Sequence, residues 1–196
     1  MNLRRRLAAH PLAAAFLFEG ALIPLALLLA VGLGVRPWAA FGISGEWLLG
    51  AILATLPLVG FLALFSALRP AWFDEIERLV HPMIGAMFRG RGIPAVLLAS
   101  VLAGLGEELL FRGVLQAWLV GPIGAWPAVV LAGVIFGLVH SVTRAYFLLA
   151  TCMGLYLGAL YQLTGNLLMP SLAHALYDAI AIVYLLRSAG PPPRAA

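Results

Sequence analysis

The stretch that decides the fold runs from Ile93 to Val120 and reads IPAVLLASVLAGLGEELLFRGVLQAWLV. A membrane-spanning helix needs about 20 mostly apolar residues, because the hydrocarbon core is about 30 Å thick and each helical residue rises about 1.5 Å. This stretch is long enough, although Glu107, Glu108 and Arg112 interrupt its apolar character. It therefore predicts a transmembrane helix with charged groups inside it.

Five further apolar stretches lie around this one. They comprise residues 11–35, 47–68, 125–142, 145–163 and 167–186. The whole chain is 63% hydrophobic and 10% charged, whereas soluble domains are about 25% charged. These values exclude a water-soluble globular protein and predict an all-α fold, a polytopic membrane helix bundle of about six transmembrane helices in a lipid bilayer.

One segment between the second and third predicted spans has a different character. Residues 69–82 read RPAWFDEIERLVHP, with apolar side chains at helical spacing and acidic groups, Glu77 among them, opposite. This pattern predicts one interfacial amphipathic helix. Its end is expected near His81, because the residue before a proline, here Pro82, disfavours helical geometry.

The positive charge consists of arginine alone. With the N-terminus inside, ten of the twelve arginines fall in inside segments and only Arg36 falls outside, which predicts that both termini are cytoplasmic. The net charge of +4 forms no basic stripe, so no nucleic-acid partner is expected. The lysine-free, alanine- and arginine-rich composition indicates a bacterial source and hence the inner (plasma) membrane.

Three regions follow along the chain. Residues 1–92 are predicted to form an N-terminal two-span region with the interfacial helix, residues 93–187 a core of four spans, and residues 188–196 a disordered tail. The first apolar run has about 24 residues, too long for a cleaved signal segment, so it is interpreted as a retained span. Glu19 lies within it and must face the bundle, a cavity or a partner; functional and packing roles are both open.

The charges inside the third span need a reason, because each costs about 2.5 to 3.5 kcal/mol at the bilayer centre. Glu108 and Arg112 are four residues apart, in the favourable acid-before-base order, and are expected to pair. Glu107 is turned by about 100° from Glu108 and stays outside that pair. A carboxylate left unpaired in this way suits proton transfer.

Two later spans carry the remaining buried polar groups. His140 follows Phe136 by four residues at the end of the fourth, and His174 and Asp178 share one face of the sixth. Either histidine alone is as often a hydrogen-bonding group between helices as a functional residue. Together with the acids of the third span, they predict a polar cavity suited to hydrolysis, with groups to deprotonate water and to stabilise an oxyanion.

The order Glu-Glu-x-x-x-Arg, Phe-x-x-x-His and His-Ala-x-x-Asp resembles the CPBP family, also called the Abi family, of CAAX prenyl proteases and bacteriocin-processing enzymes. The resemblance covers about residues 93–186. It implies an intramembrane endopeptidase that acts on a membrane-associated or lipidated protein or peptide.

The resemblance also implies roles for the site residues. Glu107 is the general base on water with His140 assisting, Glu108 and Arg112 orient the site, and His174 donates to the oxyanion. The family usually has asparagine where this chain has Asp178. An ionised aspartate only accepts hydrogen bonds, so Asp178 either is protonated or orients His174.

Members of this family are often labelled metalloproteases. Zinc with Glu107, His140 and His174 as ligands is therefore an alternative, although the chain has no His-Glu-x-x-His motif and a metal-free glutamate mechanism is favoured. Two functions of other kinds also remain open. One is a proton-coupled transporter, and the other is a non-catalytic membrane protein of the same fold that serves in immunity or as a scaffold.

Overall fold

A computed structural model describes residues 10–188, and within this range the chain forms helices and no strands. The predicted tail lies outside the described residues except for Ser188, as do the three N-terminal arginines. The elements in order are α2 (Pro11–Leu33), the 3₁₀ turn η1 (Pro37–Ala40), α3 (Gly45–Leu68), α4 (Ala71–Phe88), α5 (Gly92–Glu108), the π-helix η2 (Leu109–Gln116), α6 (Ala117–Ile123), α7 (Ala125–Val139), α8 (Arg144–Thr164) and α9 (Leu168–Arg187).

The predicted polytopic helical bundle is confirmed. Five helical segments of the described chain are long and apolar enough to cross a membrane, namely α2, α3, the continuous run from α5 through α6, α8 and α9. Large apolar side chains on the outside of the bundle, such as Leu28 at 71% and Val31 at 73% exposure, fit contact with lipid. The protein is therefore a multi-pass membrane protein.

The fourth predicted span is shorter than expected. Helix α7 ends at Val139 and not at Val142, so it has 15 residues and a length of about 22 Å, less than the hydrocarbon thickness. The sequence turns polar at His140 and Ser141, and only Val142 continues the apolar pattern beyond the observed end. The helix stops where the ring of His140 turns back to bond the carbonyl of Phe136.

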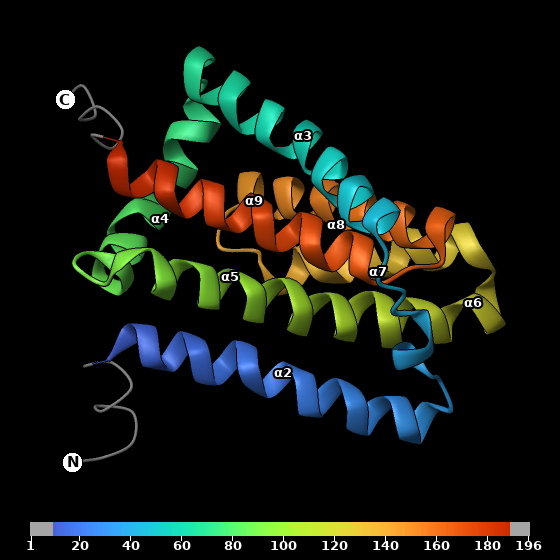
Figure 1. Cartoon of the computed structure of the whole chain (residues 1–196). Helices are drawn as coiled ribbons and strands as arrows, with labels where there is room; N and C mark the ends of the chain where they lie inside the picture. The colour runs from blue at the N-terminus through green and yellow to red at the C-terminus, as the bar shows by residue number, and fades with distance from the viewer. Residues whose placement is uncertain (1–9, 189–196) are drawn as a thin grey trace.

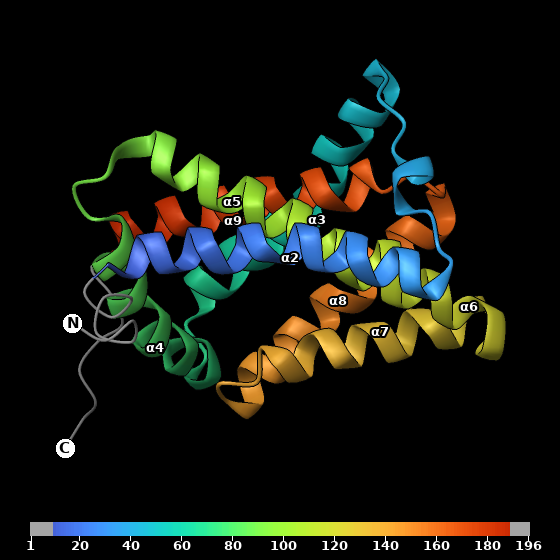
Figure 2. The same cartoon turned by 90° about the horizontal axis from the view of Figure 1, so that it is seen from below.

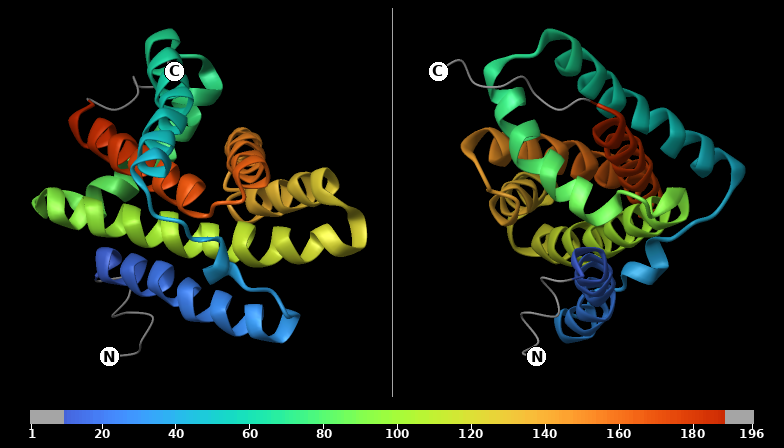
Figure 3. Two further views of the ribbon diagram at one scale, coloured as in Figure 1. Left: turned by 45° about the vertical axis from the view of Figure 1, so that its right-hand side comes forward. Right: turned by 90° about the vertical axis from the view of Figure 1, so that its left-hand side faces the viewer.

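The helices surround the long run from α5 through α6. Helix α2 packs along one side of it, α9 packs against α5, and α7 and α8 form a hairpin behind. Figure 2 shows α2 in front of α5, with α7 beside them. Helix α3 crosses obliquely over α9. The right-hand view of Figure 3, which looks along the bundle, shows α3 and α4 on the outer side of α9.

The predicted amphipathic helix is present but extends further than expected. Helix α4 continues through Pro82 to Phe88, and His81, expected near its end, lies inside it with Nε2 3.3 Å from the carbonyl oxygen of Ser188. Figure 1 shows α4 running across the end of the bundle where α2 begins and α9 ends.

Glu77 corrects the predicted polar face of α4, because it is only 2% exposed. Arg69, in the left-handed conformation that ends α3, contacts it at 2.7 Å and Asp74 at 2.8 Å. Burial alone would lower the pKa of Arg69, but the hydrogen bond and charge of Glu77, with Asp74, outweigh this and raise it. The Tyr184 hydroxyl also donates to Glu77, at 2.9 Å. The corner between α3 and α4 is thereby fastened to α9.

Candidate active site

The paired glutamates lie where the long helix changes its geometry. Glu107 and Glu108 are the last residues of α5, and the π-helix η2 begins at Leu109. A π-helix bonds i to i+5, is rare, and is frequent at functional sites. The polar side chains at this junction are deeply buried: Glu108 at the end of α5 is 0% exposed, and Arg112 and Gln116 of η2 are 1% and 0% exposed.

Arg112 connects the long helix to α8. Its Nη1 donates to Glu108 Oε1 at 2.8 Å, the pair that the i, i+4 spacing predicts, and its Nη2 donates to the carbonyl of Gly154 at 2.9 Å. At position 154 a β-carbon would lie 2.9 Å from the carbonyl oxygen of Gly133 on α7, so the close approach of α7 and α8 requires glycine. The fork of the guanidinium therefore holds Glu108 and α8 at once.

His174 comes to the same carboxylate from α9. Its Nδ1 lies 2.8 Å from Glu108 Oε1. The guanidinium of Arg112 only donates, so the carboxylate beside it is assigned as ionised, and an ionised carboxylate only accepts. The His174 Nδ1 is therefore assigned as the donor. The Nε2 of the same ring lies 3.6 Å from Asp178 Oδ2, too far for a hydrogen bond. Glu108 is therefore the group that orients His174.

Glu107 faces His140, with 3.6 Å between its Oε1 and the Nε2 of the ring. Along the predicted spans, Glu107 lies near the middle of one and His140 near the end of another, so their positions in the sequence do not place them at the same depth in the membrane. The hairpin between α6 and α7 resolves this mismatch. Glu107 lies 17 residues before Gly124 and His140 lies 16 residues after it, so the short α7 returns only to the level of Glu107.

The ring of Phe136 lies among these groups and is 2% exposed. Its centroid is 4.4 Å from that of His140 and 6.1 Å from that of His174, and the guanidinium carbon of Arg112 lies 4.7 Å from it. A cation over an aromatic face is attracted by its quadrupole. Phe136 therefore fixes the relative positions of three predicted site residues.

A cavity of about 230 Å³ opens among these side chains. Four predicted site residues line it: Glu107, His140, His174 and Asp178. Glu108 and Arg112 do not; they stand behind the cavity wall. All six are thus brought together, in two layers, and their catalytic roles remain predictions.

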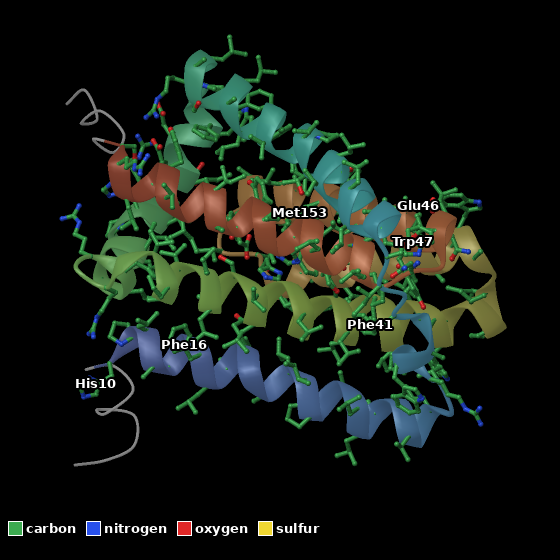
Figure 4. All side chains as sticks on the ribbon, in the orientation of Figure 1. His10, Phe16, Phe41, Glu46, Trp47 and Met153 are labelled. Atoms are coloured by element: carbon green, nitrogen blue, oxygen red, sulfur yellow. The ribbon has the colours of Figure 1, made fainter. Side chains whose placement is uncertain are left out.

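The cavity also has lining residues that were not predicted as site residues. Tyr146 and Tyr177 add two hydroxyl groups, Met153 lies at mid-length of the bundle (Figure 4), and Glu19 reaches in from α2. Glu19 stood out in the sequence as a carboxylate inside a span. The tyrosines gave no signal, because tyrosine is common at membrane interfaces.

The arrangement of the donor side chains bears on the zinc alternative. Within residues 10–188, no three His, Cys, Asp or Glu side chains form a group that could hold a metal ion. The Nδ1 atoms are engaged, that of His174 by Glu108 and that of His140 by the Phe136 carbonyl, so Nε2 is the ring nitrogen left free in each. As placed, the side chains of the described residues therefore form no ready set of three zinc ligands.

The fold and the site define a multi-pass membrane protein with an acid–histidine cavity among its helices. A model of the family described as Type II CAAX prenyl endopeptidase Rce1-like matches residues 89–180 of the chain. All three motifs lie within the matched segment, and the resemblance drawn from them is confirmed. The match points to a CAAX-type protease.

One curated protein is also similar to this chain. The uncharacterized protein YpbD of Bacillus subtilis (strain 168) is 36% identical over 97 residues, which are 48% of this chain and 47% of YpbD. The chain thus spans about half the length of the relative that it matches. No solved structure matches the chain.

Proposed function

We propose that the protein is an intramembrane endopeptidase, which hydrolyses a peptide bond with water activated by Glu107 and His140. One observation carries this proposal. Glu107 is 7% exposed, its Oε2 is buried without a hydrogen-bond partner among the described residues, and it lines a cavity beside the His140 ring. A buried carboxylate oxygen without a partner is costly, and a bound water would satisfy it.

The chemical step follows from this arrangement. Glu107 takes a proton from the water while the water oxygen attacks the substrate carbonyl carbon, and it then returns that proton to the nitrogen as the C–N bond breaks. The gap of 3.6 Å between Glu107 and His140 leaves the imidazole close enough to share the same water. Glu108 and Arg112 act through His174 as positioning residues.

The negative charge that develops on the substrate oxygen needs a donor in the cavity. His174 is the candidate. With Nδ1 donating to Glu108, donation from Nε2 as well requires the imidazolium form, and carboxylates stand near both ring nitrogens, Glu108 at 2.8 Å and Asp178 at 3.6 Å. The Asp178 carboxylate thus lies near the His174 ring, whose positive charge it would stabilise, but it does not form a hydrogen bond with that ring.

The surroundings of the cavity favour a membrane-associated or lipidated protein or peptide as substrate. A second, mostly apolar hollow of about 240 Å³ lies between α4, α8 and α9 and shares Tyr146, Leu149, Tyr177 and Asp178 with the site cavity. An apolar group of the substrate fits there while the peptide bond lies near Glu107. The core of residues 93–187, a bacterial inner-membrane location and cytoplasmic termini belong to the same proposal.

The proposed mechanism is independent of zinc, because the acids and imidazoles suffice for water activation and the donors do not form a metal cluster. We expect cleavage by the purified protein to persist, within about twofold, after treatment with 1,10-phenanthroline. The non-chelating 1,7-phenanthroline serves as the matched control. Loss of activity with the chelator alone, restored by added zinc, would show that the mechanism depends on metal.

Comparative peptidomics tests the function itself. Membranes from cells that carry wild type, Glu107→Ala or the exposed-site control Glu46→Ala are compared, and a precursor is expected to accumulate with Glu107→Ala alone. General-base catalysis contributes about 10²- to 10⁴-fold, so the loss should be nearly complete. Identical peptidomes would contradict the protease proposal. Solute uptake lost in Glu107→Gln with no cleaved product would favour a transporter, and a phenotype that survives Glu107→Ala and His140→Ala would favour a non-catalytic role.

A further inference from the structure

Glu19 is a cavity carboxylate that the proposed mechanism does not use. It belongs to α2, outside the segment that matches the family model, and yet it lines the same cavity as Glu107, His140, His174 and Asp178. Its neighbours along α2 show how unusual this is, since Leu17 and Phe18 are each 66% exposed. Helix α2 thus turns one acidic side chain inward.

The crossing of α2 and α5 sets the depth of Glu19. A β-carbon at position 106 would lie 2.8 Å from the backbone carbonyl oxygen of Glu19 and 3.2 Å from the β-carbon of Leu22. Glycine at this position lets the two backbones touch. Because Gly106 directly precedes Glu107, the contact places Glu19 at the level of the proposed general base.

Among the cavity-lining carboxylates in the described part of the chain, two have a buried oxygen without a hydrogen-bond partner. These are Glu19 Oε2 and Glu107 Oε2. The proposed function gives Glu107 a water molecule. Glu19 supplies a second acceptor, from α2. Because its Oε2 has no hydrogen-bond partner within the described protein, a donor from substrate or solvent is needed to satisfy it.

Peptide hydrolysis provides such a donor. Before cleavage the scissile amide carries one N–H group. After water adds its hydroxyl to the carbonyl carbon and the C–N bond breaks, the nitrogen holds the proton returned by Glu107. It then takes the proton of the new carboxylic acid, so that the products are a carboxylate and an ammonium ion.

On the basis of the proposed function, we propose that Glu19 is the amine-side binding residue of the site. It accepts a hydrogen bond from the scissile amide N–H and then binds the ammonium group released. The titratable groups that face it are Glu107 from α5, His140 from the end of α7, Tyr146 from α8, and His174, Tyr177 and Asp178 from α9. With Glu19 itself included, the cavity has three carboxyl groups against two imidazoles, which favours a cationic group.

Binding of a small amine tests the role without any need for catalysis. The full-length protein in detergent is titrated with propylammonium chloride, and thermal unfolding is followed by tryptophan fluorescence, with 1-propanol and sodium chloride as ligand controls. A ligand that binds the folded state raises Tm, by an amount that grows with the ratio of ligand concentration to Kd. We expect wild type to be stabilised by propylammonium and Glu19→Gln to need at least tenfold more for the same shift.

Two further variants separate charge from packing. Glu19→Asp keeps the carboxylate and should retain most of the shift, whereas Glu46→Gln removes an exposed carboxylate at the far end of the bundle (Figure 4) and should bind as wild type does. Equal stabilisation of wild type and Glu19→Gln, or no stabilisation of wild type, would overturn the inference.

Turnover gives a second measurement, on the precursor that accumulates in Glu107→Ala membranes. Glu19→Gln is expected to lower kcat about tenfold and Glu19→Asp to restore part of it; an unchanged kcat and KM in Glu19→Gln would also overturn the inference. If wild type cleaves nothing, the proposed function fails, while the amine titration still reports on Glu19.

Discussion

His140 and His174 differ in what holds their Nδ1 atoms. In His140 this nitrogen bonds the carbonyl of Phe136 on its own helix, whereas in His174 it bonds the Glu108 carboxylate across 66 residues of sequence. A backbone carbonyl orients the imidazole but carries no net charge, whereas a carboxylate also stabilises the protonated, positively charged ring. The two histidines are thus suited to different work, water activation and oxyanion stabilisation.

Asp178 is where the chain departs from the family pattern. Because Asp178 lies 3.6 Å from His174 while Glu108 lies at 2.8 Å, replacing the carboxylate should leave the ring in place. We expect Asp178→Asn to retain proteolysis within about tenfold of wild type, since an amide of the same size can donate directly to the oxyanion. The measurement is kcat/KM on the accumulated precursor.

Asp178→Leu is the matched control, since it keeps the approximate volume and removes every polar atom, and we expect it to lose more activity than the asparagine variant. Complete inactivity of Asp178→Asn would instead assign the carboxylate its own chemical role.

The sequence predicted some contacts between the site residues and not others. The i, i+4 rule predicted the contact of Glu108 with Arg112, since both lie on one helix. The contact of Glu108 with His174 joins two helices, and no local spacing encodes which oxygen meets which ring. Phe136 was noticed only as a neighbour of His140 on one face, because its contact with Arg112 depends on how α7 packs against the π-helix.

At the scale of elements, the π-helix is what the sequence concealed. Residues 109–116 read LLFRGVLQ, and nothing in the apolar spacing distinguishes a bond to i+5 from one to i+4. The wider turn is stabilised by contacts outside the helix: Arg112 and Gln116 donate to the carbonyls of Gly154 and Gly158 on α8, at 2.9 and 3.0 Å. Such tertiary support is invisible to a local pattern.

The packing of α5 on α9 determines whether Glu108 reaches His174. At Gly104 a β-carbon would lie 2.6 Å from the carbonyl oxygen of Ser171 and 2.8 Å from the backbone nitrogen of Ala175. Because both atoms belong to backbone, they cannot turn aside. We expect Gly104→Ala to separate the helices, lowering stability by about 1 to 3 kcal/mol and cleavage by about tenfold or more.

Thermal unfolding in detergent and kcat/KM measure the two effects of Gly104→Ala. Gly121→Ala is the control, since a β-carbon there meets nothing within 4 Å and alanine favours helix. A Gly104→Ala protein as stable and active as wild type would mean that the α5–α9 contact does not position Glu108.

At the scale of the whole molecule, hydropathy predicted the limits of most long helices that can cross the bilayer, but it did not predict where α4 and α7 end. Lipid selects long apolar runs, so α2, α3, α8 and α9 begin and end within two residues of their predicted limits. The end of α7 coincides with a hydrogen bond between His140 and Phe136 of the same helix, and α4 continues past Pro82 with His81 next to the carbonyl of Ser188. The site cavity lies between α7 and the helices α2, α5, α8 and α9, whereas α4 lines the adjoining apolar hollow.

The orientation in the membrane remains a prediction from the arginines, and it determines on which side the substrate is cleaved. With ten of twelve arginines on one side, the bias strongly favours that side as cytoplasmic. The α2–α3 connection should then face outward and the end of α9 inward. Ser44 and Ser188 mark these two places, just before α3 and just after α9.

Both serines can be exchanged for cysteine with little change in size, in a Cys152→Ser background that removes the chain's single native thiol. In intact spheroplasts, a membrane-impermeant maleimide should label Ser44→Cys and leave Ser188→Cys unlabelled until the membrane is permeabilised. The background variant alone should take no label in either case. The reverse pattern would put the proposed cleavage on the outer side and would leave the arginine distribution without its expected effect on topology.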